Sequence, residues 1–239
     1  MSTMNGVMTT TQPPAKVAIV DYSLGNLFSV KHACQHAGLE ATITSDKATV
    51  LAAHGVLLPG VGAFGDAMAT LHRLDLVAVL REVVARGTPL LGICLGQQLL
   101  MSESHEFGVH QGLGFFEGDV RRLDHPREGD RELKVPHVGW NAVHRPAGAP
   151  QDLWADTPLD GLADGVFQYF VHSYAAQPRE PAAVLAMARY GHLEFCAGLM
   201  RGNVIGLQFH PERSGPAGLH IYHNFASLVR RRSASEILA

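Results

Sequence analysis

The chain has 239 residues, of which 46% are hydrophobic and 17% are charged, so it is long enough to bury a substantial core. Its formal net charge of −3 gives no general attraction to nucleic acid, although three arginines at residues 230–232 form a short basic run, which we interpret as the solvated end of a last helix. No apolar stretch reaches the roughly 20 residues that a bilayer crossing needs, which argues against a membrane protein. The three cysteines (Cys34, Cys94 and Cys196) form neither a disulfide framework nor a metal motif, and this favours a reducing, cytoplasmic compartment.

The two ends of the chain differ from the rest in composition. Residues 1–15, MSTMNGVMTTTQPPA, offer little that can be buried and lack the basic start and apolar centre of a secretory signal. We therefore expect a disordered N-terminal leader over 1–15, one domain over 16–232 and a C-terminal tail over 233–239.

From residue 16, strand-like and helix-like segments alternate. Apolar or β-branched runs predict strands at 16–21, 40–45, 55–59 and 89–94, and helical periodicity predicts helices at 25–38, 75–87 and 95–104. This alternation is typical of a parallel sheet wrapped by helices, with right-handed crossovers.

Beyond residue 112 the segments become short and strand-like, with Pro, Gly and Asp turns between them. Strands are predicted at 115–123, 140–145, 167–176, 182–190, 193–199 and 204–210, and apolar residues three apart predict an amphipathic final helix over 218–232. The fold class is therefore α/β, with three layers, a mainly parallel central sheet flanked by helices, and an additional antiparallel or mixed strand extension.

A candidate nucleophile lies between a predicted strand and a predicted helix. Residues 92–96, GICLG, have the form G-x-C-x-G, a thiol version of the nucleophile elbow. So sharp a turn needs small neighbours, and the helix N-terminus behind Cys94 favours the thiolate and offers free N–H groups to an oxyanion. Taken alone, this pattern also fits a buried structural cysteine.

The candidate base and its orienting acceptor follow the last predicted strand, in the sequence His210-Pro211-Glu212. In extended chain, residues i and i+2 point the same way, so the imidazole and the carboxylate can lie side by side. Cys94 would attack, His210 would carry the proton, and Glu212 would hold the imidazole tautomer and stabilise its cation. Both strands end at the carboxyl edge, where α/β sheets gather their sites.

A glycine-rich loop, PGVGAFG at residues 59–65, follows the third predicted strand. Gly60 to Gly65 also match G-x-G-x-x-G, but the first β-α turn lacks that fingerprint and Glu82, the acidic residue about 20 positions on, falls inside a helical pattern. We therefore prefer a loop that offers a backbone N–H to an oxyanion over a dinucleotide-binding loop.

With GICLGQQLL, PGVGAF and GLQFHPERSG together, the chain resembles the class I glutamine amidotransferases. Two further segments, DYSLGN at 21–26 and PHVGWN at 136–141, resemble one branch of that family, the glutaminase subunits of imidazole glycerol phosphate synthase in histidine biosynthesis. The resemblance covers residues 17–229. It implies that glutamine is hydrolysed to glutamate and ammonia without a cofactor or metal.

The resemblance also implies a partner, a cyclase subunit with a (β/α)₈ barrel that forms a heterodimer with this chain. The partner would use the ammonia to convert PRFAR to imidazole glycerol phosphate and AICAR. Glutaminase activity is expected to be weak until the partner binds, because the oxyanion peptide near Val61 must reorient. Roles transfer by position to oxyanion amides (Val61, Gly62 and Leu95), substrate contacts (Gln98, Ser173 and Tyr174) and the partner interface (Asn26, Pro136, Trp140 and Asn141).

The sequence departs from the family pattern at two positions. Ser23 stands where the family has glycine, which affects a backbone turn, and Gln97 stands where methionine usually follows the elbow, which adds a polar group that needs a partner. Core packing is an alternative for Trp140. Cys34 and Cys196 are expected in the core, and a zinc site has little support, because the best pair, His220 and His223, has no nearby cysteine.

Four alternatives remain open. The chain could serve another synthase, such as that of anthranilate or pyridoxal phosphate, which should lack the segments at 21–26 and 136–141. It could be a stand-alone cysteine hydrolase of γ-glutamyl bonds, fully active alone. A non-enzymatic scaffold would be expected to have lost a triad member, and a redox enzyme should bind a nicotinamide cofactor.

Overall fold

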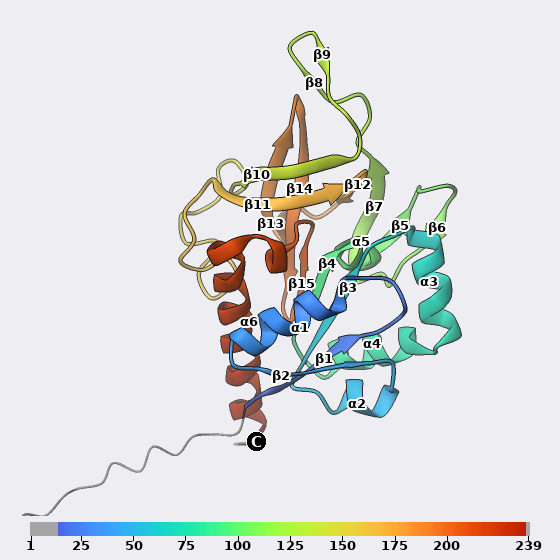
Figure 1. Ribbon diagram of the computed structural model, residues 1–239, viewed down its shortest axis with the longest axis vertical. Coiled ribbons are helices and arrows are strands. Elements are labelled where there is room, and N and C mark those ends of the chain that lie inside the picture. The colour runs from blue at the N-terminus through green and yellow to red at the C-terminus, as the bar shows by residue number, and fades with distance from the viewer. Residues whose placement is uncertain (1–13, 238–239) are drawn as a thin grey trace, which may run out of the picture.

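A computed structural model of the chain describes residues 14–237 (Figure 1). The predicted leader therefore lies outside the described residues except for its last two positions. The elements are β1 (Lys16–Val20), α1 (Leu27–His36), β2 (Glu40–Thr44), α2 (Lys47–Leu51), β3 (Gly55–Gly60), α3 (Phe64–Arg73), α4 (Leu76–Ala85), β4 (Leu90–Cys94), α5 (Leu95–Leu99), β5 (Met101–Ser104), β6 (His110–Gln111), β7 (Phe116–Arg122), β8 (Arg127–Glu128), β9 (Arg131–Glu132), β10 (His137–Val143), β11 (Val166–His172), β12 (Tyr174–Pro178), η1 (Pro181–Ala183), β13 (Val184–Tyr190), β14 (Leu193–Arg201), β15 (Val204–Leu207), η2 (Pro211–Arg213) and α6 (Gly215–Ile237).

A seven-stranded sheet in the order β13-β14-β15-β4-β3-β1-β2 forms the centre of the molecule. The five strands from β15 to β2 are parallel, and β14 and β13 extend the sheet antiparallel. The predicted fold class, a mainly parallel sheet with an antiparallel extension, is thus confirmed.

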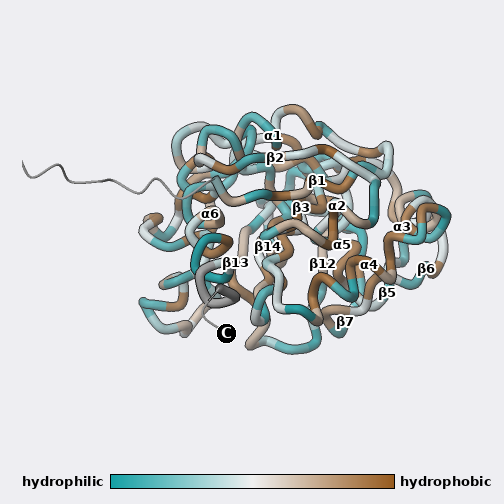
Figure 2. The backbone as a smooth tube through the Cα atoms, turned by 90° about the horizontal axis from the view of Figure 1, so that it is seen from below, coloured by the Kyte–Doolittle hydropathy of each residue, from teal (hydrophilic) through white to brown (hydrophobic). Residues whose placement is uncertain are grey.

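Helices cover both faces of this sheet, because its parallel strands are buried on both sides. One apolar cluster joins side chains of α1 and α6 to alternate residues of the strands, among them Ile19, Leu57 and Leu91. A second cluster joins α3, α4 and α5 to the residues between them, such as Val56, Leu58 and Leu90. Figure 2 shows α4 largely hydrophobic, whereas α3 carries both hydrophobic and hydrophilic residues.

Three smaller sheets complete the fold: β12-β7-β5-β6, the pair β10-β11 and the hairpin β8-β9. The single helix predicted over 95–104 is wrong, because α5 ends at Leu99 and residues 101–104 form β5, which pairs with β6 and β7. The single strand predicted over 167–176 is likewise two strands, β11 and β12, separated by Ser173.

The final helix is longer than its periodicity indicated. α6 continues to Ile237, into the segment predicted as a C-terminal tail. None of the helices within residues 14–237 combines the length and the hydropathy that a bilayer crossing requires.

Candidate active site

Cys94 occupies a strained turn between β4 and α5. Its φ of 56° and ψ of −109° are rare for a residue with a side chain, and such strain is a feature of nucleophile elbows. The flanking glycines are required by close packing: a Cβ on Gly96 would lie 1.6 Å from the Leu58 carbonyl oxygen, and one on Gly92 would lie 2.7 Å from the backbone of Gly96. The backbone thus holds the thiol at the carboxyl edge of the sheet.

His210 and Glu212 follow β15, the strand next to β4. The imidazole Nδ1 lies 2.7 Å from the Glu212 carboxylate, and both side chains are buried. Because a carboxylate only accepts hydrogen bonds, Nδ1 carries a proton and Nε2 faces the other way. Nε2 is buried without a hydrogen bond of good geometry to any described residue, so it is free to exchange a proton with the thiol.

The electrostatics of His210 favour its charged form. Burial lowers the pKa of the imidazole, but the neighbouring Cys94 and the Glu212 carboxylate outweigh burial and raise the pKa to about 10. In this structure the thiol donates to the Val171 carbonyl at 3.7 Å and accepts from the Gln208 amide at 3.7 Å. A positively charged imidazole beside a cysteine favours the thiolate, which is the reactive form of a cysteine nucleophile.

A cavity of about 250 Å³ opens beside the thiol. This volume suits a single amino acid better than a peptide or a nucleotide. The cavity contains every residue for which an oxyanion or substrate role was predicted, and it adds others that were not. Its lining residues are Val61, Gly62, Cys94, Leu95, Gln98, Glu106, Pro136, Val171, His172, Ser173 and Tyr174.

The glycine-rich loop lies against the nucleophile. Gly60, at the end of β3, is the register partner of Cys94, and Gly62 has a φ of 121°, which favours glycine. A Cβ on Gly60 would lie 2.0 Å from the Tyr22 hydroxyl, which is itself buried without a partner among the described atoms. Since Glu82 lies inside α4 and not at a strand end, the loop does not match a dinucleotide site.

Polar side chains link the cavity wall to the sulfur. The Gln98 amide donates to the Tyr174 carbonyl at 2.9 Å and to the Gln208 side chain at 3.2 Å, and Gln208 in turn donates to Cys94. Sequence reasoning missed Gln208, although it lies two residues before His210 and such residues point the same way in extended chain. That spacing was a usable signal.

Glu106 was also missed. Its carboxylate lines the cavity and accepts a hydrogen bond of 2.7 Å from the backbone N–H of Phe64, so it caps α3, whose N-cap residue Ala63 has no capping side chain. No motif marks Glu106, because it reaches the cavity from the loop after β5.

Of the residues predicted for the partner interface, Asn26 follows β1 at the carboxyl edge of the central sheet, and Pro136 lines the cavity at Cys94. Asn26 is exposed at the start of α1, and Trp140 on β10 is 54% exposed, so the core-packing alternative for Trp140 is wrong. Trp140 packs edge-on against Tyr169, Arg213 stacks over that tyrosine, and η2 packs against α1. These contacts connect β10 to α1 through η2. The exposed large apolar side chains of α1, β10 and β11 are called here the apolar face, and they are Phe28, Val138, Trp140 and Phe167.

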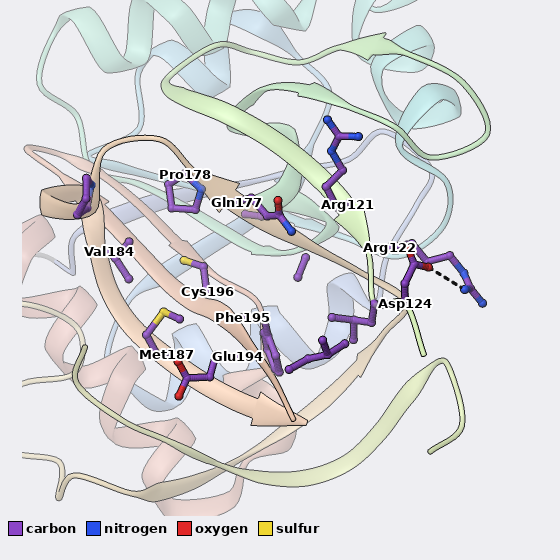
Figure 3. Close-up of a pocket in the computed structure, with 15 residues that line it drawn as sticks. Arg121, Arg122, Asp124, Gln177, Pro178, Val184, Met187, Glu194, Phe195 and Cys196 are labelled. Atoms are coloured by element: carbon purple, nitrogen blue, oxygen red, sulfur yellow. Dashed lines mark hydrogen bonds and ion pairs between the residues drawn. The ribbon is translucent and has the colours of Figure 1, made fainter. Parts of the chain in front are cut away.

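A larger cavity, of about 720 Å³, lies elsewhere, between β7 and β12 on one side and β13 and β14 on the other (Figure 3). Arg121, Arg122, Gln177 and Glu194 line it, and Arg122 is paired with Asp124 at its rim. The cavity shares no lining residue with the one at Cys94. Of the two cysteines expected in the core, Cys196 lines this cavity, and both Cys34 and Cys196 are buried, as predicted.

Comparison with known proteins identifies the family. The family model described as "Glutamine amidotransferase class-I" matches residues 18–228. "Imidazole glycerol phosphate synthase subunit HisH" of Moorella thermoacetica is 48% identical over 90% of this chain and 95% of its own length, and that of Rhodopirellula baltica is 46% identical over 88% and 97%. The solved structure of PurLQS from Thermotoga maritima covers 90% of this chain and 99% of its own with a TM-score of 0.68, and at 19% identity it shows the fold alone. The chain therefore belongs to the class I glutamine amidotransferases and, within them, to the HisH subunits of imidazole glycerol phosphate synthase.

Proposed function

We propose that this chain is the glutaminase subunit of an imidazole glycerol phosphate synthase, and that Cys94, His210 and Glu212 release ammonia from L-glutamine. The observation that carries the proposal is the placement of a strained thiol beside a buried imidazole–carboxylate pair, at the wall of a cavity of about 250 Å³. The three free, buried cysteines suit a protein of the reducing cytoplasm.

The reaction proceeds in two halves. The Cys94 thiolate attacks the side-chain amide carbon of glutamine, and the His210 imidazolium gives its Nε2 proton to the departing nitrogen. The nitrogen leaves as ammonia, and the acyl group stays on Cys94 as a γ-glutamyl thioester. Water then attacks the thioester, with His210 taking a proton, and glutamate and the free thiol are released. Glu212 holds the tautomer of His210 and stabilises its positive charge in both halves.

Backbone amides stabilise the negative oxygen that forms in each half. The N–H of Leu95 directly follows the nucleophile, and the Val61–Gly62 peptide lies in the same cavity. Removing one such donor typically costs about 10² to 10³ in rate. Reorientation of a single peptide near Val61 on partner binding would therefore be enough to keep the glutaminase slow until its ammonia can be used.

The rest of the cavity suits the amino-acid part of glutamine. Ser173 and Tyr174 lie in the break between β11 and β12 and would hold the α-carboxylate and the amine, while Gln98 would contact the side chain. Glu106 supplies the negative charge that an α-ammonium group requires.

The apolar face is the proposed docking surface for the cyclase subunit, a (β/α)₈ barrel that forms a heterodimer with this chain. Large exposed aromatic side chains such as Trp140 are typical anchors of such interfaces, and Asn26 and Asn141 are close to them in the sequence. Pro136 belongs to both regions, because it lines the cavity and precedes β10. The cyclase would combine the ammonia with PRFAR to give imidazole glycerol phosphate and AICAR.

The test is glutamate release from glutamine by the purified chain, alone and with a cyclase subunit and its nucleotide ligand. We expect activity that rises with the partner and is abolished by Cys94→Ala. High activity without a partner would instead support a stand-alone hydrolase. Absence of stimulation by this cyclase would support a different synthase partner, and an active Cys94→Ala variant would rule out the triad.

A further inference from the structure

Two buried histidines connect the proposed partner surface to the active-site cavity. His137 lies on β10 and His172 at the end of β11, where they are register partners, and Nδ1 of His137 lies 3.2 Å from Nε2 of His172. At one end, the Asn141 amide lies 3.4 Å from Nε2 of His137, and at the other, Nδ1 of His172 lies 2.9 Å from the Tyr174 carbonyl oxygen. These four groups are called here the imidazole chain.

Only one arrangement of protons satisfies the imidazole chain with neutral rings. The Tyr174 carbonyl can only accept, so His172 carries its proton on Nδ1 and accepts at Nε2. His137 must then donate from Nδ1 and accept at Nε2, where the Asn141 amide donates. Asn141 fits this direction, because its other amide hydrogen goes to the Arg189 carbonyl at 2.7 Å and its oxygen accepts from the N–H of Ala142.

The surroundings keep both rings neutral and fixed. His137 stacks on Tyr190 at 4.2 Å between ring centroids and on Phe170 at 5.2 Å, and Phe195 packs against both histidines. Burial lowers the pKa of His137 to about 4, and burial with the nearby His137 lowers the pKa of His172 to about 3. Rotating either ring would break two hydrogen bonds in a closely packed core, so the imidazole chain is rigid.

The cavity end of the imidazole chain continues to the nucleophile. The Tyr174 carbonyl that accepts from His172 also accepts from the Gln98 amide, which contacts Gln208, and Gln208 donates to the Cys94 sulfur. The other end lies on β10, where Asn141 directly follows the exposed Trp140. A shift of β10 on docking would therefore be transmitted by hydrogen bonds to the Tyr174 carbonyl and the Gln98 side chain in the cavity wall.

We propose that His137 and His172 are positioning residues that couple occupancy of the apolar face to the placement of Tyr174, Gln98 and Cys94 in the glutaminase site. The proposal rests on the proposed function, since it needs a partner that docks at this surface. It assigns a role to two histidines that take no part in the proton transfers of the triad. The observation behind it is the continuous hydrogen bonding from Asn141 to the sulfur, in which each group donates toward the Tyr174 carbonyl and the Gln98 amide links that carbonyl to Gln208 and Cys94.

The test replaces both histidines, by His137→Phe with His172→Phe. Removing one ring nitrogen alone would leave a buried group without a partner, whereas replacing both by similar apolar rings removes the whole polar link and keeps the packing. The matched control is His36→Phe with His223→Phe, a pair of exposed histidines whose ring centroids lie 5.5 Å apart on α1 and α6. The quantity to compare is the stimulation factor, the ratio of kcat/KM for glutamine with saturating cyclase to that without.

We expect the double variant His137→Phe with His172→Phe to bind the cyclase as tightly as the parent does. Its stimulation factor should fall about tenfold, which is within the usual range of coupling between two sites. The control pair should keep the parent factor. If the imidazole-chain variant kept it too, the rings would contribute packing only and the proposal would be overturned. A parent chain that no cyclase stimulates would instead contradict the proposed function itself.

A spectroscopic measurement tests the proposal first on the parent chain and then on a variant that keeps both rings. Ring ¹⁵N chemical shifts of the parent chain should show both histidines neutral near pH 7 with the proton on Nδ1. Asn141→Ala should perturb the His172 shifts as well as those of His137, because the signal must pass through both rings. An Nε2-protonated tautomer at either ring, or a perturbation confined to His137, would overturn the proposal.

Discussion

The side-chain oxygen of Gln97 is buried and has no hydrogen-bond partner among the described residues. Its nitrogen makes long contacts, 3.5 Å to the Cys196 carbonyl oxygen and 3.9 Å to the Cys196 sulfur. A buried, unsatisfied polar atom costs about 1 to 3 kcal/mol, and methionine has nearly the same shape. We expect Gln97→Met to raise the free energy of unfolding by about 1 kcal/mol or more in urea denaturation. Gln35→Met, on the exposed face of α1, is the control and should change it little; equal effects of the two would contradict the explanation.

Ser23 carries a backbone cost that a glycine at this position would avoid. Its φ is 67°, in the left-handed region, although its N–H gains a hydrogen bond to the Asp21 carboxylate. The left-handed conformation costs a residue with a Cβ about 1 to 2 kcal/mol. Glycine avoids this cost, but it loses more conformational entropy on folding, which offsets part of the gain. Ser23→Gly should therefore stabilise the chain by roughly 0.5 to 1 kcal/mol, measured by thermal denaturation. Ser23→Ala keeps the Cβ and should give no gain, so stabilisation by alanine would argue against strain.

The raised pKa of His210 makes stability depend on pH. The folded-state pKa is about 10 against an ordinary 6.5, so the bound proton adds stability that is fully present below about pH 6.5 and is lost as the pH rises toward 10. Cys94→Ala removes the contribution of Cys94 to this raised pKa. The variant should therefore lose less stability than the parent between about pH 7 and about pH 9.5 in urea denaturation. Equal losses would show that Cys94 does not hold the proton on His210.

At the scale of single residues, the sequence revealed those whose chemistry depends on local chain geometry. Cys94 needs a strand-to-helix turn between two glycines, and His210 and Glu212 need only an extended i, i+2 spacing, so both features leave a pattern in the sequence. Glu106 and His172 left no such pattern. They reach the cavity only because separate elements pack together.

At the scale of elements, the parallel half was predicted well and the connections less so. Strands buried on both faces give continuous apolar runs, which made β1, β3 and β4 easy to find. Residues 95–104 have apolar side chains that suit a helix, but residues 101–104 find strand partners in β6 and β7, and this tertiary pairing ends α5 after five residues. So short a helix contributes less of a dipole to Cys94 than the predicted one would.

Glu106 connects two elements, because it caps α3 and lines the cavity. Glu106→Gln keeps a side-chain oxygen for the Phe64 N–H but removes the negative charge. We expect the KM for glutamine to rise about tenfold or more, the usual weight of a hydrogen bond to a charged group, with little change in stability. Steady-state kinetics and a thermal melt check both. The control is Glu103→Gln, which changes a nearby carboxylate on β5 outside the cavity lining. An unchanged KM for Glu106→Gln would contradict the proposed contact between Glu106 and the α-ammonium group.

At the scale of the whole molecule, the apolar face and the cavity share one edge of the central sheet. Asn26 follows β1, Val61 follows β3, and Cys94 ends β4, so the partner surface and the chemistry meet where the parallel strands end. The mainly parallel sheet and its antiparallel extension could be predicted in outline from the sequence. The exposure of Phe28 and Phe167 could not, because an aromatic side chain in an amphipathic segment is more often buried.

Trp140 offers the sharpest test of this surface. It is the largest side chain of the apolar face, and interface aromatics of this kind often carry 2 kcal/mol or more of binding free energy. Trp140→Ala should weaken cyclase binding by about 30-fold or more in Kd, measured by titration calorimetry. Because the loss lies in affinity, a high cyclase concentration should restore most of the stimulated glutaminase activity.

The control is Arg86→Ala, at the end of α4 and therefore at the opposite edge of the sheet, where it pairs with Glu82. It removes a long exposed side chain and should leave the Kd unchanged. Equal Kd values for the two variants would place the docking surface elsewhere on the chain. Stimulation that stays low for Trp140→Ala even at saturating cyclase would mean that the indole transmits the signal as well as anchoring the partner, since saturation removes any difference in affinity.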